Sequence, residues 1–319
     1  MKVVFMGTPE FAVPSLRQVA TSGHEVLAVI TNPDRPSGRG RRTSAPPVKG
    51  AALELGLQVL QPTSLDANDV ADELASLDAD LFVVVAFSIL PRRLLAIPRL
   101  GSVNLHPSLL PAYRGAAPIV WALFNGETET GVTTFLLSPR VDAGDVLLQE
   151  RVAIKPEETA GELEARLREI GASLVVASLD GLDKGGLTPS PQRGAKGASR
   201  APKLGREDGR LDWRLSTENL RNRVRGANPV PGAFTEWAGG VLKVHRARRA
   251  EGGFRTEPGT VLFAGAKEGG LVVATSDGAL QLLEVQPAGS PRMEAAAFVR
   301  GHRIEVGMVL GAPADASGG

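Results

Sequence analysis

Short apolar segments alternate with amphipathic segments through the first part of this chain, and this alternation limits the fold more than any other feature. Residues 2–6 and 25–31 are predicted strands, and residues 80–86 are almost wholly apolar, as in a strand covered on both faces. A helix is predicted over residues 66–77. Strands that alternate with helices form a mostly parallel sheet. We therefore predict an α/β, Rossmann-like domain with its binding site at the carboxyl ends of the strands.

Composition excludes several classes of protein. The 319 residues contain no cysteine, which excludes disulfides, thiolate nucleophiles and cysteine-ligated zinc. The net charge is +1, so a polyanionic partner would have to be bound by local basic clusters. No apolar run approaches the ~20 residues of a membrane-spanning helix, and the first ten residues lack the apolar core of a signal peptide. We expect a cytoplasmic protein that does not enter a membrane.

The character of the sequence changes after residue 183. Residues 184–205 are rich in Gly, Pro, Ser, Lys and Arg and contain no acidic residue, which is typical of a basic linker. In residues 206–319, short apolar runs are separated by turn residues, a pattern that favours a small all-β barrel of the OB-like kind. We predict an α/β domain over residues 1–183, the linker, and this C-terminal β-barrel domain.

Asn104 and His106 flank a single leucine at the end of a predicted strand. Side chains two residues apart on a strand lie on one face, so the amide and the imidazole should point the same way. Pro107 ends the strand because proline has no N–H for the ladder. A hydrogen-bond donor beside a proton carrier suits acyl transfer. The alternative is that two polar residues simply cap a strand end.

An aspartate is a plausible partner for the imidazole. Asp142 follows another predicted strand, over residues 131–136, and a carboxylate there can orient a histidine ring and raise its pKa. Asp145 is a competing candidate, and a structural role in the turn is the alternative for both.

Residues 32–47 form a long predicted loop in which Arg35, Arg39, Arg41 and Arg42 are opposed by one acid, Asp34. A solvated loop is the alternative, but loops of this length are often functional. Arginines without aromatic neighbours favour contacts with phosphates over base stacking.

Motifs spread in order along the whole chain resemble the methionyl-tRNA formyltransferase family. They are Phe5-Met6-Gly7-Thr8-Pro9-Glu10-Phe11, Pro33-Asp34-Arg35-Pro36-Ser37-Gly38-Arg39-Gly40, Asn104 to Pro111 with Arg114 to Ile119, Val141 to Asp145, Leu211-Asp212-Trp213, Asn228 to Gly232 and Gln286 to Gly289. The block from Asn104 to Ile119 is highly specific. The resemblance implies the formyltransferase fold. It also implies transfer of a formyl group from 10-formyltetrahydrofolate to the α-amine of methionyl initiator tRNA.

The resemblance also implies roles for individual residues. The catalytic constellation would be Asn104, His106 and Asp142. The residues expected to line the folate site are Ser108, Leu109, Leu110 and Pro111. The residues expected to contact tRNA or methionine are Arg39, Arg41, Arg42, Lys203 and Phe11, with core packing as the alternative for Phe11. Either Asn104 or His106 would stabilise the negative charge on the formyl oxygen, and the sequence leaves this division of roles open.

The chain departs from the family in the segment Ala86-Phe87-Ser88-Ile89-Leu90-Pro91, which is one residue shorter and lacks the usual glycine. This segment borders the expected folate pocket. The remaining histidines lack metal-ligand spacing, so no metal is expected. We expect a monomer.

Three alternative functions remain for a chain with Asn104, His106 and Asp142. It could be a formyltransferase for a small amine, a folate-using hydrolase, or a non-catalytic RNA-binding protein. The arginine loop and the C-terminal domain favour tRNA over a small substrate, and the complete catalytic constellation argues against a non-catalytic protein.

Overall fold

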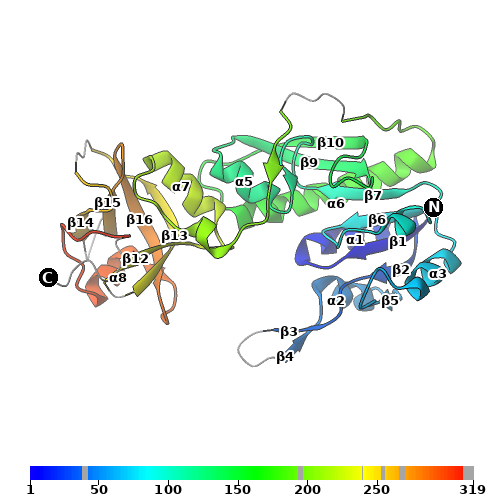
Figure 1. Cartoon of the computed structure of the whole chain (residues 1–319), viewed down its shortest axis with the longest axis horizontal. Coiled ribbons are helices and arrows are strands. Elements are labelled where there is room, and N and C mark those ends of the chain that lie inside the picture. Colours follow the sequence, from blue (N-terminus) through cyan, green and yellow to red (C-terminus); the bar gives the residue numbers. More distant parts are fainter. Residues whose placement is uncertain (38–41, 193–196, 239, 253–255, 266–269, 312–319) are drawn as a thin grey trace. The chain divides into compact units, whose positions relative to one another are not determined.

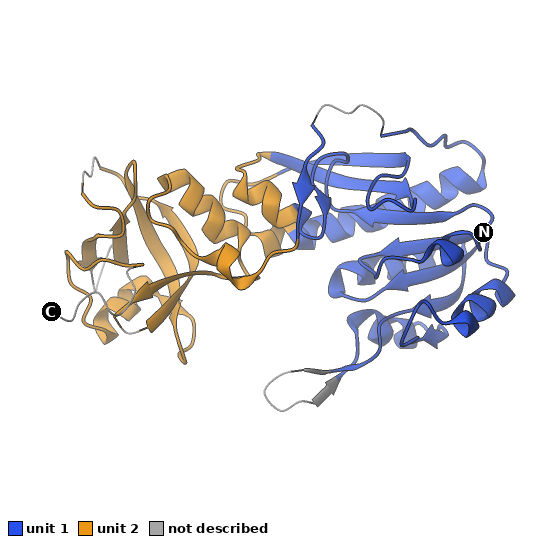
Figure 2. Ribbon diagram, viewed as in Figure 1, with its two compact units in different colours: residues 1–118, 129–153, 164–202 blue, residues 119–128, 154–163, 203–319 orange. Residues whose placement is uncertain are grey.

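The computed structural model describes residues 1–37, 42–192, 197–238, 240–252, 256–265 and 270–311. The chain divides into two compact units (Figure 2). Unit 1 contains residues 1–118, 129–153 and 164–202, and unit 2 contains residues 119–128, 154–163 and 203–319. The limits given above, with a linker over residues 184–205, stay a prediction.

A seven-stranded sheet in the order β10-β9-β7-β6-β1-β2-β5 forms the centre of unit 1 (Figure 1). Its strands are β1 (Lys2–Gly7), β2 (Glu25–Ile30), β5 (Val59–Leu60), β6 (Leu81–Val85), β7 (Ser102–His106), β9 (Glu129–Leu136) and β10 (Val146–Ala153). The five strands from β5 to β7 are parallel, whereas β9 is antiparallel to both of its neighbours. The predicted α/β, mostly parallel sheet is therefore confirmed.

Helices connect these strands. They are η1 (Glu10–Ala12), α1 (Val13–Ala20), α2 (Pro47–Glu54), α3 (Asn68–Ser76), α4 (Arg92–Leu95), α5 (Pro118–Phe124) and α6 (Ala160–Asp183). On one face of the sheet, Phe82 and Val84 pack with Val70 and Leu74 of α3 and with Leu94 of α4. All five residues of β6 are buried, as the unbroken apolar run predicted.

Two short pairs of strands lie outside the main sheet. The antiparallel pair β3 (Arg35–Ser37) and β4 (Arg42–Ser44) lies within the predicted arginine loop. The parallel pair β8 (Arg114–Gly115) and β11 (Arg200–Ala201) joins the region after β7 to a segment near the end of unit 1.

Unit 2 is an antiparallel β domain. Its strands are β12 (Ala233–Trp237), β13 (Gly240–Arg249), β14 (Val261–Gly265), β15 (Gly270–Ala274), β16 (Ala279–Pro287) and β17 (Met293–Glu294). Five of them follow the order β12-β13-β16-β15-β14, and β17 also pairs with β16. The predicted β domain is confirmed as this sheet, which is accompanied by η2 (Arg206–Gly209), α7 (Thr217–Gly226) and α8 (Ala295–Gly301). Ser216 caps α7 by accepting the amide hydrogen of Asn219.

Within the described ranges, no helix combines the length and apolar character needed to cross a bilayer.

Candidate active site

The end of β7 presents Asn104 and His106 on one face of the sheet. The strand lies between β6 and β9, with Asn104 opposite Val84 on one side and Phe135 on the other. His106 is only 5% exposed, whereas Asn104 is partly exposed. The spacing of the two residues on a central strand thus gives them a common direction but different access to solvent.

His106 is held between a carbonyl group and a carboxylate. Its Nε2 donates to the Tyr113 carbonyl at 2.9 Å, and its Nδ1 lies 3.9 Å from Oδ2 of Asp142. Because Nε2 has a carbonyl partner, we assign the proton of the neutral ring to Nε2, which leaves Nδ1 as an acceptor. Burial lowers the pKa of His106 below 6.5, although Asp142 and the Tyr113 carbonyl both act to raise it.

Asp142 is oriented by its own backbone and by β8. Its φ of +49° is left-handed, and its Oδ2 accepts the amide hydrogen of Gly115 at 2.8 Å. Two residues later the turn passes close to β9, where a Cβ on Gly144 would lie 1.7 Å from the Leu136 carbonyl oxygen. Asp145, the competing candidate, is exposed, so the structure places Asp142 beside the imidazole.

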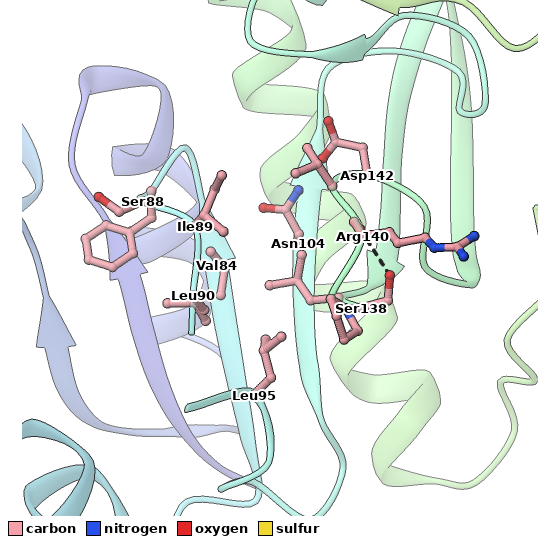
Figure 3. Close-up of a pocket in the computed structure, with 13 residues that line it drawn as sticks. Val84, Ser88, Ile89, Leu90, Leu95, Asn104, Ser138, Arg140 and Asp142 are labelled. Atoms are coloured by element: carbon pink, nitrogen blue, oxygen red, sulfur yellow. Dashed lines mark hydrogen bonds between the residues drawn. The ribbon is translucent and has the colours of Figure 1, made fainter. Parts of the chain in front are cut away.

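A cavity of about 110 Å³ opens beside Asn104 and Asp142 (Figure 3). One wall comes from β6 and the segment that follows it, and the other comes from residues 137–142. The lining residues are Val84, Phe87, Ser88, Ile89, Leu90, Leu95, Asn104, Leu137, Ser138, Pro139, Arg140, Val141 and Asp142. Eight of these thirteen residues are apolar, and the other five are polar.

Two features of the cavity suit a ligand. The side-chain amide of Asn104 has no hydrogen-bond partner among the residues that the structure describes, and it reaches toward Asp142 (Figure 3). Ile89 is 79% exposed and Val141 is 58% exposed, although both are large apolar residues. An unpaired donor between exposed apolar walls is suited to a flat, partly polar molecule.

The segment from Ser108 to Pro111 is fixed by bonds to β9. Thr133 Oγ1 donates to the Ser108 carbonyl at 2.6 Å and accepts from the Leu110 amide at 3.1 Å. Ser108 and Leu110 are buried. None of Ser108, Leu109, Leu110 and Pro111 is among the lining residues of the cavity, and their role at a folate site stays a prediction.

The residues expected to contact tRNA or methionine belong to different parts of the chain. Phe11 is buried in η1, and Lys203 is exposed in unit 2. Arg39 and Arg41 lie outside the described residues, and Arg42 begins β4. These assignments stay predictions.

The base of the arginine loop is anchored. Asp34 accepts from Lys49 Nζ at 2.8 Å and from Gln61 Nε2 at 2.8 Å. These bonds keep the pKa of Asp34 below its usual range. Asp34, the single acid of the predicted arginine loop, therefore already bonds a lysine.

Several residues around the centre were not anticipated from the sequence. Residues 137–141 form one wall of the cavity. Gln192 and Ser199, which belong to the predicted linker, bond the loops that carry Asp142 and Tyr113. No spacing rule relates such positions, because the contacts join segments far apart in the chain.

Known proteins resemble this chain along most of its length. The family model described as "Formyl transferase" matches residues 1–179, and "Formyl transferase, C-terminal domain" matches residues 203–303. The methionyl-tRNA formyltransferase of Heliobacterium modesticaldum is 48% identical, over 98% of this chain and 100% of that protein. The methionyl-tRNA formyltransferase of Pelotomaculum thermopropionicum is 45% identical, over 98% of this chain and 99% of that protein.

Solved structures share the fold at lower identity. HypX from Aquifex aeolicus in complex with tetrahydrofolic acid has a TM-score of 0.63 and 21% identity, over 94% of this chain and 47% of that one. The sugar 3N-formyl transferase WlaRD, determined in the presence of dTDP and 5-N-formyl-THF, has a TM-score of 0.66 and 17% identity, over 91% of this chain and 99% of that one. The sequence matches along almost the entire chain decide the family: the chain belongs to the methionyl-tRNA formyltransferases.

Proposed function

We propose that the protein transfers the formyl group of 10-formyltetrahydrofolate to the α-amino group of methionine on initiator tRNA. The observation that carries this proposal is that Asn104 and Asp142 line one cavity, while His106 lies two residues from Asn104 on β7 and 3.9 Å from Asp142. The membership of the chain in a family of methionyl-tRNA formyltransferases supports the identity of donor and acceptor.

Asn104 is the residue best suited to stabilise the charge of the reaction. When the amine attacks the formyl carbon, negative charge develops on the formyl oxygen. The Asn104 amide lines the cavity and has no hydrogen-bond partner in the part of the chain that the structure describes, so it can bond this oxygen without breaking another bond. Removal of one such donor typically lowers kcat by about 10²–10³-fold.

His106 is the residue best suited to carry the proton. The amine loses a proton as the new C–N bond forms, and the folate nitrogen gains one as the old C–N bond breaks. The unprotonated Nδ1 of His106 can accept the first proton, and Asp142 at 3.9 Å stabilises the resulting imidazolium. The same ring then returns the proton to the leaving nitrogen, so the cycle leaves the enzyme unchanged.

The proposed occupant of the cavity is the head of a formyl-folate, which supplies a carbon at the formyl level of oxidation. Its apolar walls suit a ring face, and Ser138, Asn104 and Asp142 provide polar groups near the same opening. The shortened segment Phe87 to Leu90 contributes one wall. The proposal therefore places the pterin between this segment and residues 137–141.

The arginine loop and unit 2 are assigned to tRNA. A small amine would not require an arginine-rich hairpin. Arg39, Arg41, Arg42 and Lys203 are the proposed contacts with the phosphate backbone.

The direct test supplies the purified protein with 10-formyltetrahydrofolate and either methionyl initiator tRNA or methionyl elongator tRNA, and measures formyl-methionine. We expect product from the initiator tRNA, and none from a reaction with the His106→Ala variant. Parallel reactions contain glycinamide ribonucleotide or a nucleotide-linked amino sugar. Formylation of one of these small amines, without formylation of tRNA, would overturn the proposal.

A further inference from the structure

Residues 190–192 and 197–201 pack against the loops of the candidate active site, although residues 184–205 have the composition of a linker. Ser190 exchanges two backbone hydrogen bonds with Val146, both at 2.8 Å. Further along, β11 pairs with β8 through Arg200 and Ala201. All of these residues belong to unit 1. The segment therefore forms part of the unit that carries the catalytic residues.

Gln192 connects two loops through a single side chain. Its Oε1 accepts from Arg114, at 2.6 Å from Nη2 and 3.2 Å from Nε. Its Nε2 donates to the carbonyl oxygens of Asp142, at 3.2 Å, and Gly144, at 2.7 Å. The oxygen of this amide thus bonds one loop, and its nitrogen bonds the other.

The two loops that Gln192 joins are the ones that hold the proton carrier and its carboxylate. The loop of Tyr113 to Gly115 accepts from His106 through the Tyr113 carbonyl and donates to Asp142 through the Gly115 amide. The other loop contains Asp142 itself. Both Tyr113 and Asp142 have left-handed φ angles, of +58° and +49°. Such conformations are unfavourable for residues other than glycine and persist only where neighbouring contacts fix them.

Ser199 supports the first of these loops from the same segment. Its Oγ accepts the Tyr113 amide hydrogen at 2.9 Å, and its carbonyl accepts the Arg114 amide hydrogen at 3.0 Å. Gln192 and Ser199 thus both bond the Tyr113 loop, and Gln192 also bonds the Asp142 loop. Gln192 is the side chain that bonds both loops.

We propose that Gln192 is a positioning residue for formyl transfer, which maintains the alignment of His106 with Asp142 by bonding both loops at once. Gln192 acts on the reaction through these two residues. The inference rests on the proposed function for its kinetic consequences. Its structural consequence, the coupling of Gln192 to the His106–Asp142 pair, can be measured without any reaction.

Two substitutions test the hydrogen bonds of the Gln192 side chain. Gln192→Met keeps the length of the side chain and removes all four hydrogen bonds. Gln192→Glu keeps an acceptor for Arg114 and places a carboxylate against two carbonyl oxygens. Gln18→Ala is the matched control, because Gln18 lies on α1 in the same unit and its side chain accepts one bond, from Ser173.

We expect kcat to fall by about 10- to 100-fold in both Gln192 variants, with KM for each substrate changed by less than about threefold, because a misalignment near 1 Å can cost about 10²-fold. The control should retain the activity of the wild type. Unchanged kcat in both variants would overturn the proposal. The proposal would also be overturned if the loss of kcat equalled the loss of folded protein that thermal unfolding measures.

The second measurement is an NMR titration of the His106 ring in the wild type and in Gln192→Met, assigned by the signal lost in His106→Gln. Asp142 raises the pKa of His106, so a displaced Asp142 should leave this pKa lower than in the wild type. An identical titration in both proteins would overturn the inference. If the wild type lacked formyl transfer and the titration still shifted, the proposed function would fail while the coupling remained.

Discussion

At the scale of single residues, the candidate site combines groups whose properties depend on burial. His106 is buried against a carboxylate, Asp142 is bonded by a backbone amide, and Asn104 is partly exposed. The common direction of Asn104 and His106 follows from their spacing and could be predicted. The choice of Asp142 over Asp145 could not, because it depends on a left-handed φ at Asp142 that no residue type requires.

Single substitutions should separate the roles. Asn104→Ala should lower kcat by about 10²–10³-fold, because an oxyanion donor is lost. His106→Ala and Asp142→Ala should abolish most turnover while the protein stays folded. Rates of formyl-methionine formation and circular dichroism of each variant provide the measurement. Near-normal turnover in His106→Ala or Asp142→Ala would contradict the assignment.

The pH dependence follows from the direction of the His106 shift. Burial lowers its pKa below 6.5, and the ring must be unprotonated to accept a proton. Activity should therefore be retained at pH 6.5 and be lost only as the pH falls through the lowered pKa. A profile of kcat/KM between about pH 5 and 9 measures this limb. If the wild type lost activity through a pKa above 6.5, and His106→Gln showed no such loss, the pKa of His106 would be raised instead of lowered.

At the scale of elements, the strands of the sheet were the most predictable part. Runs such as Leu81–Val85 are apolar throughout because both faces of the strand are covered, and this pattern is visible without a structure. The walls of the cavity were not predictable, since residues 87–90 and 137–141 meet only after the sheet has formed. Residues 190–192 and 197–201 could be taken for part of a linker because their hydrogen bonds are mostly to backbone groups, which leave little trace in the sequence.

The turn after Asp142 should tolerate no larger residue at Gly144. A methyl group there would lie 1.7 Å from the Leu136 carbonyl oxygen, so Gly144→Ala must displace the turn or the end of β9. We expect a destabilisation of about 1–3 kcal/mol, the usual range for forced overpacking, together with reduced activity. Thermal unfolding measures the effect.

Gly50→Ala is the matched control for this substitution. Gly50 lies within α2, and an added Cβ there has no atom within 4 Å. Alanine should stabilise this helix by about 0.5–1 kcal/mol. A Gly144→Ala protein as stable as the wild type would show that the turn has more space than the structure indicates.

At the scale of the whole molecule, charge does not by itself indicate a nucleic-acid partner. With 36 basic and 35 acidic residues, the chain has almost no net charge, so attraction to tRNA must arise from local groups. The arginine loop is one concentration of such groups, and its one acid is already bonded to Lys49.

Neutralising Arg39, Arg41 and Arg42 together, each to Gln, should raise KM for methionyl-tRNA and reduce its dependence on salt, because fewer counterions are released on binding. The KM for the formyl donor should not change. Kinetics at several salt concentrations provide the measurement. The control neutralises Arg17, Arg92 and Arg151, which are exposed residues of α1, α4 and β10. Equal effects in the two triple variants would assign the result to total charge.

The division into units has a consequence for how this enzyme can evolve. The chain passes between the units five times, after residues 118, 128, 153, 163 and 202. Unit 2 therefore includes Phe124, whose ring lies edge-on to Trp121 and under the guanidinium of Arg223. Gene fusion at one junction could not exchange this unit for another as a cassette, because two of its pieces are encoded inside its neighbour. An exchange at residue 202 would leave residues 119–128 and 154–163, which belong to unit 2, with a foreign remainder of that unit.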